Sequence, residues 1–129
     1  MPFKIYHYVN NQGCDEFSLW ENNLQSIQRG KLKEKIDKLR LYGNDLYPHL
    51  LTDTGISGIQ KLRIRGNVQL RPLLCRGPIE ILEEYTLLMG AKEVGGKWKP
   101  KDAPVVADER KQDVINNPTE RRIERVQIL

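Results

Sequence analysis

The chain has 129 residues, a net charge of +4 at pH 7 and a charged fraction of 29%, a size and composition typical of one folded domain rather than two domains or a disordered chain. It contains no run of about eighteen uncharged apolar residues and no basic start followed by an apolar run, so the sequence predicts no membrane span and a cytoplasmic location. Cys14 and Cys75 have no C-x-x-C spacing and no neighbouring histidine cluster, which argues against a zinc site and a disulfide framework.

The first half of the chain predicts one strand and two helices. Residues 3–9 are rich in aromatic and β-branched side chains and end at a run of turn formers, which favours an opening strand. Apolar residues then recur at helical spacing from about Asp15, a plausible cap, to Gly30, a plausible stop. A second helix follows from Lys31 to Gly43. One of its faces is apolar and the other carries charges of both signs, a pattern typical of a solvated helix face.

The second half predicts three consecutive strands and a helix. Residues 44–57 are rich in turn formers and predict a long loop. The runs 58–65, 68–75 and 79–89 are separated by Gly66-Asn67 and Gly77-Pro78, which predicts an antiparallel meander. A basic segment then leads to a helix that opens at Pro104, runs to about Asn117 and stops at Pro118.

These elements together predict an α+β fold. We expect a small antiparallel sheet, made of the N-terminal strand and the meander, packed against the two N-terminal helices, with a further helix near the C-terminus. Residues 1–117 form the predicted domain. Residues 118–129 form a tail that is charged and then apolar, for which a short helix, an exchanged strand and disorder all stay open.

One segment is distinctive in its charge. From residue 61 to residue 79 there are five cations and no acidic residue. On a strand Lys61, Arg63 and Arg65 point to one face at intervals of roughly 6.5–7 Å, and a hairpin turn after them can bring Arg71 beside this row. Such a face suits RNA, because phosphates attract cations and a guanidinium can stabilise the charge that develops during strand cleavage. The alternative is a solvated edge strand that its charges protect from aggregation.

The other candidate residues give weaker evidence of a function. His7 and His49 are an acid–base pair only if the fold brings them together, and nothing in the sequence indicates that it does. The carboxylates of Glu80, Glu83 and Glu84 can bind a metal or act as a base, but ion pairing with the cationic strand is the simpler interpretation. Trp98 suits either base stacking or packing, with packing favoured. The usual nucleotide, metal and acyl-transfer motifs are absent, so the sequence predicts no cofactor and no metal, and any catalysis is expected to be metal-free.

Several segments of the chain resemble those of a known protein family. The order of the elements, the segment Gly58-Ile59-Gln60-Lys61-Leu62-Arg63-Ile64-Arg65-Gly66, the following Arg71, and the segment Tyr85-Thr86-Leu87-Leu88-Met89-Gly90-Ala91-Lys92 resemble the RelE/ParE toxin superfamily, nearest to its phage-derived, HigB-like branch. The resemblance covers about residues 1–117. The chain departs from the family where Pro72 interrupts the strand that carries Arg71.

The resemblance implies a toxin of a toxin–antitoxin system. Such toxins enter the ribosomal A site and cut mRNA there without a metal, and an antitoxin, commonly a helix-turn-helix repressor, keeps them silent. By position, Lys61 and Arg63 resemble the paired basic residues of the family, one of which acts as a general base or activates the 2′-hydroxyl. Arg71 resembles the arginine that stabilises the transition state. Arg65 and Lys92 resemble further phosphate contacts, and Arg76, from the same acid-free segment, is expected to bind RNA as well.

Two other functions stay open for this fold. One is a non-catalytic module that binds protein, such as a gyrase-directed toxin or a phage accessory protein, in which the basic strand docks an acidic partner segment. The other is plain nucleic-acid binding, which would show a steep dependence on salt without cleavage.

Overall fold

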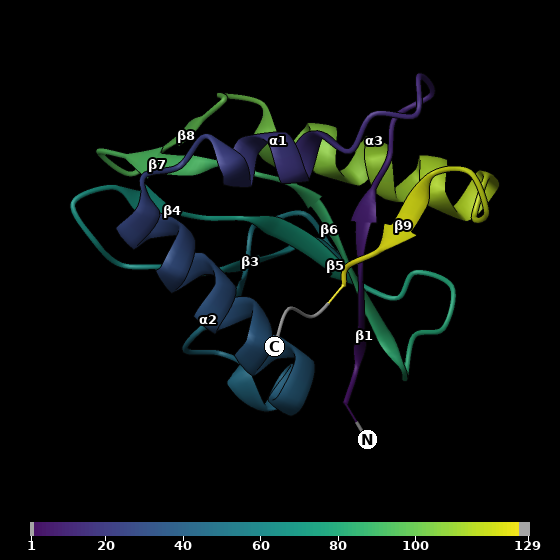
Figure 1. The fold of residues 1–129 in the computed structure, drawn as a ribbon, viewed down its shortest axis with the longest axis horizontal. Helices are drawn as coiled ribbons and strands as arrows, with labels where there is room; N and C mark the ends of the chain where they lie inside the picture. The colour runs from purple at the N-terminus through teal and green to yellow at the C-terminus, as the bar shows by residue number, and fades with distance from the viewer. Residues whose placement is uncertain (1, 127–129) are drawn as a thin grey trace.

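A computed structural model describes residues 2–126 of the chain, and Figure 1 shows its fold. In chain order the elements are β1 (Lys4–Tyr8), α1 (Glu16–Asn22), α2 (Ser26–Tyr42), the 3-10 helix η1 (Gly43–Leu46), β2 (Leu51–Asp53), β3 (Gln60–Leu62), β4 (Gln69–Leu70), β5 (Leu73–Arg76), β6 (Glu84–Met89), β7 (Lys92–Val94), β8 (Lys97–Lys99), α3 (Ala103–Asn116) and β9 (Arg122–Glu124). The predicted α+β class is therefore confirmed.

The strands form two sheets. The larger has the order β2-β3-β5-β6-β1-β9, and the smaller has the order β4-β7-β8. Neighbours in the larger sheet are antiparallel except β1 and β6, which run parallel with Ile5 opposite Tyr85. The expectation of an antiparallel sheet is therefore wrong for the N-terminal strand, and the sheet is mixed. The two helices after β1 carry the chain across the sheet, and the meander ends beside β1 in the same direction.

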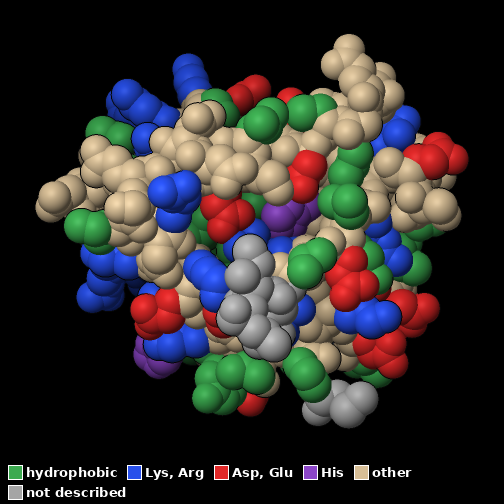
Figure 2. Space-filling view, in the orientation of Figure 1, with side chains coloured by type: hydrophobic (Ala, Val, Ile, Leu, Met, Phe, Trp, Pro, Cys, Tyr) green, Lys and Arg blue, Asp and Glu red, His purple; other side chains and the backbone are tan. Residues whose placement is uncertain are grey.

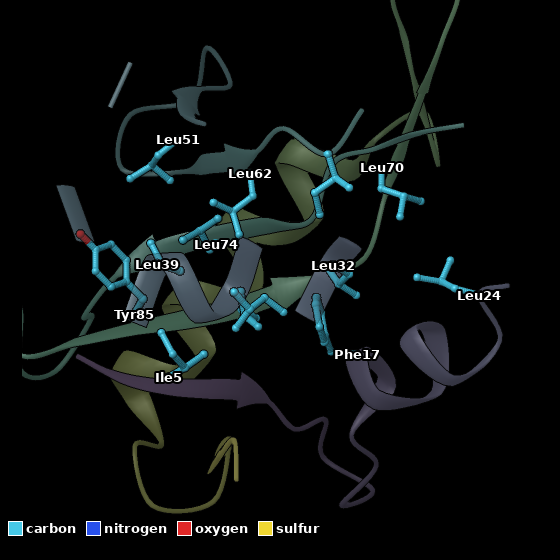
Figure 3. Packing of buried hydrophobic residues seen from close by; sticks show 13 residues of the cluster. Ile5, Phe17, Leu24, Leu32, Leu39, Leu51, Leu62, Leu70, Leu74 and Tyr85 are labelled. Carbon is cyan, nitrogen blue, oxygen red and sulfur yellow. The ribbon is translucent and has the colours of Figure 1, made fainter. Parts of the chain in front are cut away.

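A separate hydrophobic core covers each face of the larger sheet. On one face α2 buries Leu32, Ile36 and Leu39 against strand residues such as Leu62 and Leu74, as Figure 3 shows for the labelled side chains. On the other face the buried residues of α3 pack on Leu73, Cys75 and neighbours from β6. α2 and α3 lie on opposite sides of the larger sheet in Figure 1, so its middle strands are covered on both faces.

The first two helices differ from the prediction at their junction. Asp15 caps α1, as expected, because its side chain accepts a hydrogen bond from the Ser18 amide. Gly30, however, lies inside α2 rather than at the end of α1. The break comes earlier, at Leu24, whose side chain is buried in the core, and Gln25 then starts the next helix. Core packing at the break therefore outweighs the weak helix propensity of glycine.

The predicted strands are shorter than the sequence patterns suggest. Only Gln60–Leu62 of the first run forms β3, and Ile64 makes an isolated bridge to Leu70. The second run is split into β4 and β5 around Arg71 and Pro72, since proline has no amide hydrogen for the ladder. The third run enters the sheet only at Glu84.

Three further strands lie where the sequence patterns predict none, one in the expected loop and two in the basic segment before the C-terminal helix. β2 occupies the expected loop and pairs with β3 at the edge of the sheet. β7 and β8 form a hairpin around Gly95 and Gly96, both of which have positive φ, the conformation that a tight two-residue hairpin turn requires. α3 matches the predicted C-terminal helix to within a residue at each end.

The predicted tail packs on the domain as far as the structure describes it. β9 runs antiparallel to β1 and covers the edge of the larger sheet. One arginine of α3 and three of the tail form ion pairs with carboxylates elsewhere in the domain. The pairs are Arg110–Glu16, Arg121–Asp113, Arg122–Glu84 and Arg125–Glu21. Residues 127–129 of the predicted tail lie outside the described residues. No helix within residues 2–126 is both long and apolar enough to cross a membrane.

A buried histidine connects β1 to the tail. The Nδ1 atom of His7 lies 3.0 Å from Asp15 Oδ2, and its Nε2 atom lies 3.1 Å from Arg125 Nη1. Because a guanidinium can only donate, Nε2 accepts and the proton sits on Nδ1. Glu21 holds Arg125 in place through two contacts of 2.7 Å. Burial lowers the pKa of His7, and Arg125 adds to this, while Asp15 and Glu21 act in the opposite direction.

This arrangement predicts a loss of stability in mild acid. His7 has a lower pKa in the folded state than its ordinary 6.5, so between the two values the unfolded chain binds more protons than the folded one. The stabilisation is therefore present above about pH 6.5 and is lost as the pH falls toward the folded pKa, with a slope of at most ~1.4 kcal/mol per pH unit. Urea unfolding from pH 8 to pH 5 should show this slope, and His7→Gln should flatten it. An unchanged slope in the variant would assign the effect to other groups.

Candidate nucleic-acid interface

The predicted basic row lies at the end of β3. Leu62 and Ile64 are buried in the core, whereas Lys61 and Arg63 are partly exposed and Arg65 is exposed. Lys61 stands opposite Leu73 of β5, on the face of the sheet that carries α3. The structure thus brings the three cations to one end of the larger sheet.

Arg71 lies beside this row but is buried, with only 6% of the residue exposed. Its Nη1 atom donates to the carbonyl oxygens of Ile64 and Leu70 at 3.2 and 2.8 Å, and its Nη2 atom donates to Gln69 Oε1 at 2.7 Å. Its Nε atom lies 3.2 Å from Glu93 Oε1. Burial lowers the pKa of Arg71, and Glu93 opposes this. The guanidinium therefore joins β4 to the end of the basic row, and most of its donors are occupied.

Glu93 is the residue that organises the buried half of the site. Its Oε1 atom accepts from Lys61 Nζ at 2.7 Å and also contacts Arg71. Partial burial acts to raise the pKa of Glu93, but hydrogen bonds and charge from the two cations outweigh it, so the pKa lies below its ordinary value. One carboxylate thus holds two of the three residues predicted to be catalytic.

The β7–β8 hairpin supplies both Glu93 and an aromatic ring. Glu93 pairs with Trp98 across the hairpin, and Lys61 Nζ lies 5.1 Å from the centre of the Trp98 ring. Trp98 also packs against the core beneath α3, which supports the packing interpretation of this residue. Sequence reasoning missed Glu93. The available signal was that it is the single carboxylate between residues 85 and 101 in an otherwise basic segment.

Two grooves adjoin the exposed part of the row. The first has a volume of about 300 Å³ and is lined by Lys31, Glu34, Lys35, His49, Leu50, Arg63, Ile64 and Arg65. The second has a volume of about 620 Å³ and runs between the start of α2 and the β3–β4 connection. Lys31 and Arg65 line both grooves, and Lys31 Nζ donates to the Arg65 carbonyl at 3.3 Å. Lysine and arginine side chains gather along the left side of Figure 2, where Figure 1 labels β4, β7 and β8.

The charge of the grooves is strongly one-sided. Their lining residues include the cations Lys31, Lys35, Arg63, Arg65 and Lys92 and a single carboxylate, that of Glu34. The lysines of α2 were missed as site residues because alternating charges on a helix are typical of a solvated face. Only the fold reveals that two of them stand opposite the basic row.

Some predicted residues lie elsewhere. Arg76 is at the far end of β5, roughly 16 Å along the strand from Arg71, and its Nε atom donates to the Ile81 carbonyl at 2.8 Å. His49 is exposed in the first groove, whereas His7 is buried against α1 and the tail, so the two histidines share no pocket. Glu84 forms an ion pair, but with Arg122 rather than with the basic strand. Within residues 2–126 no three His, Cys, Asp or Glu side chains are grouped to hold a metal ion.

Comparison with known proteins adds no relative. No family model, no curated protein and no solved structure matches this chain. The structure is that of an α+β domain with two adjoining cationic grooves at one end of its larger sheet.

Proposed function

We propose that the protein is a toxin that cuts mRNA on the ribosome without a metal ion. The observation that carries the proposal is the double groove, in which five cations and one carboxylate surround the end of β3. The phosphates of a nucleic acid bind such a surface whatever the nucleotide sequence. The resemblance of segments 58–66 and 85–92 to HigB-like toxins narrows the RNA to translated message and adds a helix-turn-helix antitoxin as the expected partner.

The first groove contains the groups that metal-free RNA cleavage requires. In this reaction the 2′-oxygen attacks the adjacent phosphorus and its proton passes to a base. The bond from phosphorus to the 5′-oxygen breaks, the 5′-oxygen takes a proton from water, and a 2′,3′-cyclic phosphate remains. Arg63 and Lys35 can bind the phosphate oxygens and stabilise their added charge. His49 is exposed beside them and has a ring nitrogen that can accept the proton.

Lys61 and Arg71 have different roles in this proposal. Because Lys61 donates to Glu93, we assign it a contribution of positive charge rather than the role of base. Arg71 is a positioning residue, since its donors hold the Ile64 and Leu70 carbonyls and so fix the strand end that carries Arg63. Arg65 and Lys92 bind flanking phosphates.

The test is to map new RNA 5′ ends in translating ribosomes after addition of the purified protein. We expect cuts on ribosome-engaged message, and we expect Arg63→Ala and His49→Ala each to reduce them by about tenfold or more. Arg76→Ala is the matched control, because Arg76 lies outside both grooves. Absence of cuts with the native chain, or undiminished cuts with both groove variants, would refute the proposal.

A second candidate is nucleic-acid binding without cleavage. The observation in its favour is that Glu93 engages both Lys61 and Arg71, two of the three residues that the family resemblance assigns to catalysis. Affinity for RNA that falls steeply with salt, together with no new 5′ ends, would indicate this function.

A further inference from the structure

The second groove differs from the first in the kind of side chains that line it. Besides Lys31, Arg65 and Lys92, it has carboxamides and an apolar wall and no carboxylate. The carboxamides are Asn23, Gln25, Gln28 and Asn67, and the apolar wall consists of Leu24, Ile27, Ile64, Val68 and Leu70. Carboxamides both donate and accept hydrogen bonds, which suits the edges of nucleobases, and an apolar wall suits the faces of bases.

The groove is also placed next to the proposed cleavage groove. Arg65 and Lys31 stand at the junction of the two, so a phosphate bound between them leaves one neighbouring nucleotide in each groove. The hydrogen bond from Lys31 to the Arg65 carbonyl ties the β3–β4 connection to α2 and so holds the two walls together.

Lys92 lines the second groove, and the neighbouring Glu93 carboxylate binds other cations instead. Lys92 pairs with Leu70 across β4 and β7, and both residues line the groove. Glu93 is the next residue on β7 and therefore points to the opposite face, where it binds Lys61 and Arg71. The β4–β7 ribbon thus separates the second groove, whose charged lining residues are all cations, from the partly buried Glu93 carboxylate.

We propose that the second groove binds the base of one unpaired RNA nucleotide next to the phosphate that lies between Arg65 and Lys31. Asn23 and Asn67 contact the base edge, the apolar wall contacts its face, and Arg65 and Lys92 contact the flanking phosphates. The inference rests on the proposed function for the identity of the ligand, but its test requires only binding.

The experiment compares two short single-stranded RNA oligonucleotides that differ by one abasic position at their centre. Both carry the same phosphates, so the difference between them isolates the base. By fluorescence anisotropy the full native chain should bind the complete oligonucleotide about fivefold or more tightly than the abasic one. In the double variant Asn23→Ala/Asn67→Ala this preference should fall toward one. Asn44→Ala, at an exposed position after α2, should retain it.

Photocrosslinking locates the base directly. With 4-thiouridine at the central position, crosslinks are expected within residues 23–28 or 66–68 of the native chain. Equal affinity for the two oligonucleotides, or crosslinks confined to the first groove or to other surfaces, would overturn the inference. A base-dependent affinity without any cleavage would support it while refuting the proposed function, and cleavage without a base preference would do the reverse. Binding of neither oligonucleotide would overturn it in favour of a protein partner.

Discussion

Replacing Arg71 with alanine is expected to lower the free energy of unfolding by about 3 kcal/mol. The guanidinium is almost fully buried, and it donates to two backbone carbonyls, to Gln69 and to Glu93. Its removal takes one donor from each of the Ile64 and Leu70 carbonyls, which then keep only the backbone hydrogen bonds of their own bridge, and it opens a cavity between β4 and the basic row. Glu93 keeps Lys61, which limits the loss.

Urea unfolding of three chains measures this effect. Arg63→Ala is the matched control, because Arg63 lines an open groove and should change stability by less than about 1 kcal/mol. Arg71→Lys should fall between the two, since an ammonium cannot serve carbonyls and carboxylate with the same planar fork. Equal stabilities of Arg71→Ala and Arg63→Ala would contradict a structural role for Arg71. The consequence for function is practical, because loss of RNA cleavage in Arg71→Ala is informative only at a temperature where that variant is folded.

The alternation of charged and apolar residues was the most reliable guide to the site. It correctly separated the buried Leu62 and Ile64 from the more exposed cations between and after them. It did not reveal that Lys61 binds Glu93 whereas Arg63 and Arg65 line a groove with residues of α2. Such alternation is local, since it follows from the backbone geometry of an extended chain.

What could not be predicted depends on contacts between distant parts of the chain. Glu93 is more than twenty residues from the cations that it holds, and Lys31 reaches Arg65 only because α2 crosses the sheet beside β3. The burial of Arg71 has the same origin, because a strand pattern does not reveal that a second sheet will cover it. The sequence therefore predicted that cations gather at this site, but it did not predict which of them are buried and which are exposed.

Local turn chemistry gave mixed guidance for the fold. Gly43 ends α2 with a positive φ and the Phe3 ring fills the space beside it, so this glycine marked a real boundary. Gly30 has open space around it and lies within a helix, so it marked none. The sequence does not decide the structure of the tail, because its strand β9 depends on pairing with β1, at the other end of the sequence.

That tail provides the second large effect, since Arg122→Ala is also expected to cost about 3 kcal/mol of stability. Arg122 forms an ion pair with Glu84, whose residue is only 2% exposed, and its guanidinium lies 4.0 Å from the centre of the Tyr6 ring. Without it, the Glu84 carboxylate keeps only a 3.3 Å contact with the Ile79 amide. A charge left buried with so little compensation is costly, and the contact of the guanidinium with the Tyr6 ring is lost as well.

Its neighbour supplies the control for this second effect. Arg121 pairs with Asp113, whose side chain is 33% exposed and keeps Tyr8 and Asn117 as partners, so Arg121→Ala should cost about 1 kcal/mol or less. Adding Glu84→Gln to Arg122→Ala should recover part of the loss, because the unpaired charge is removed. Equal effects of the two arginine variants, or no recovery in the double variant, would contradict the ion pair.

Since both residues lie on or beside β9, across the larger sheet from the grooves, RNA binding by the folded fraction should stay unchanged in either variant. Stability at this edge and phosphate binding at the other can therefore be altered separately in one small domain.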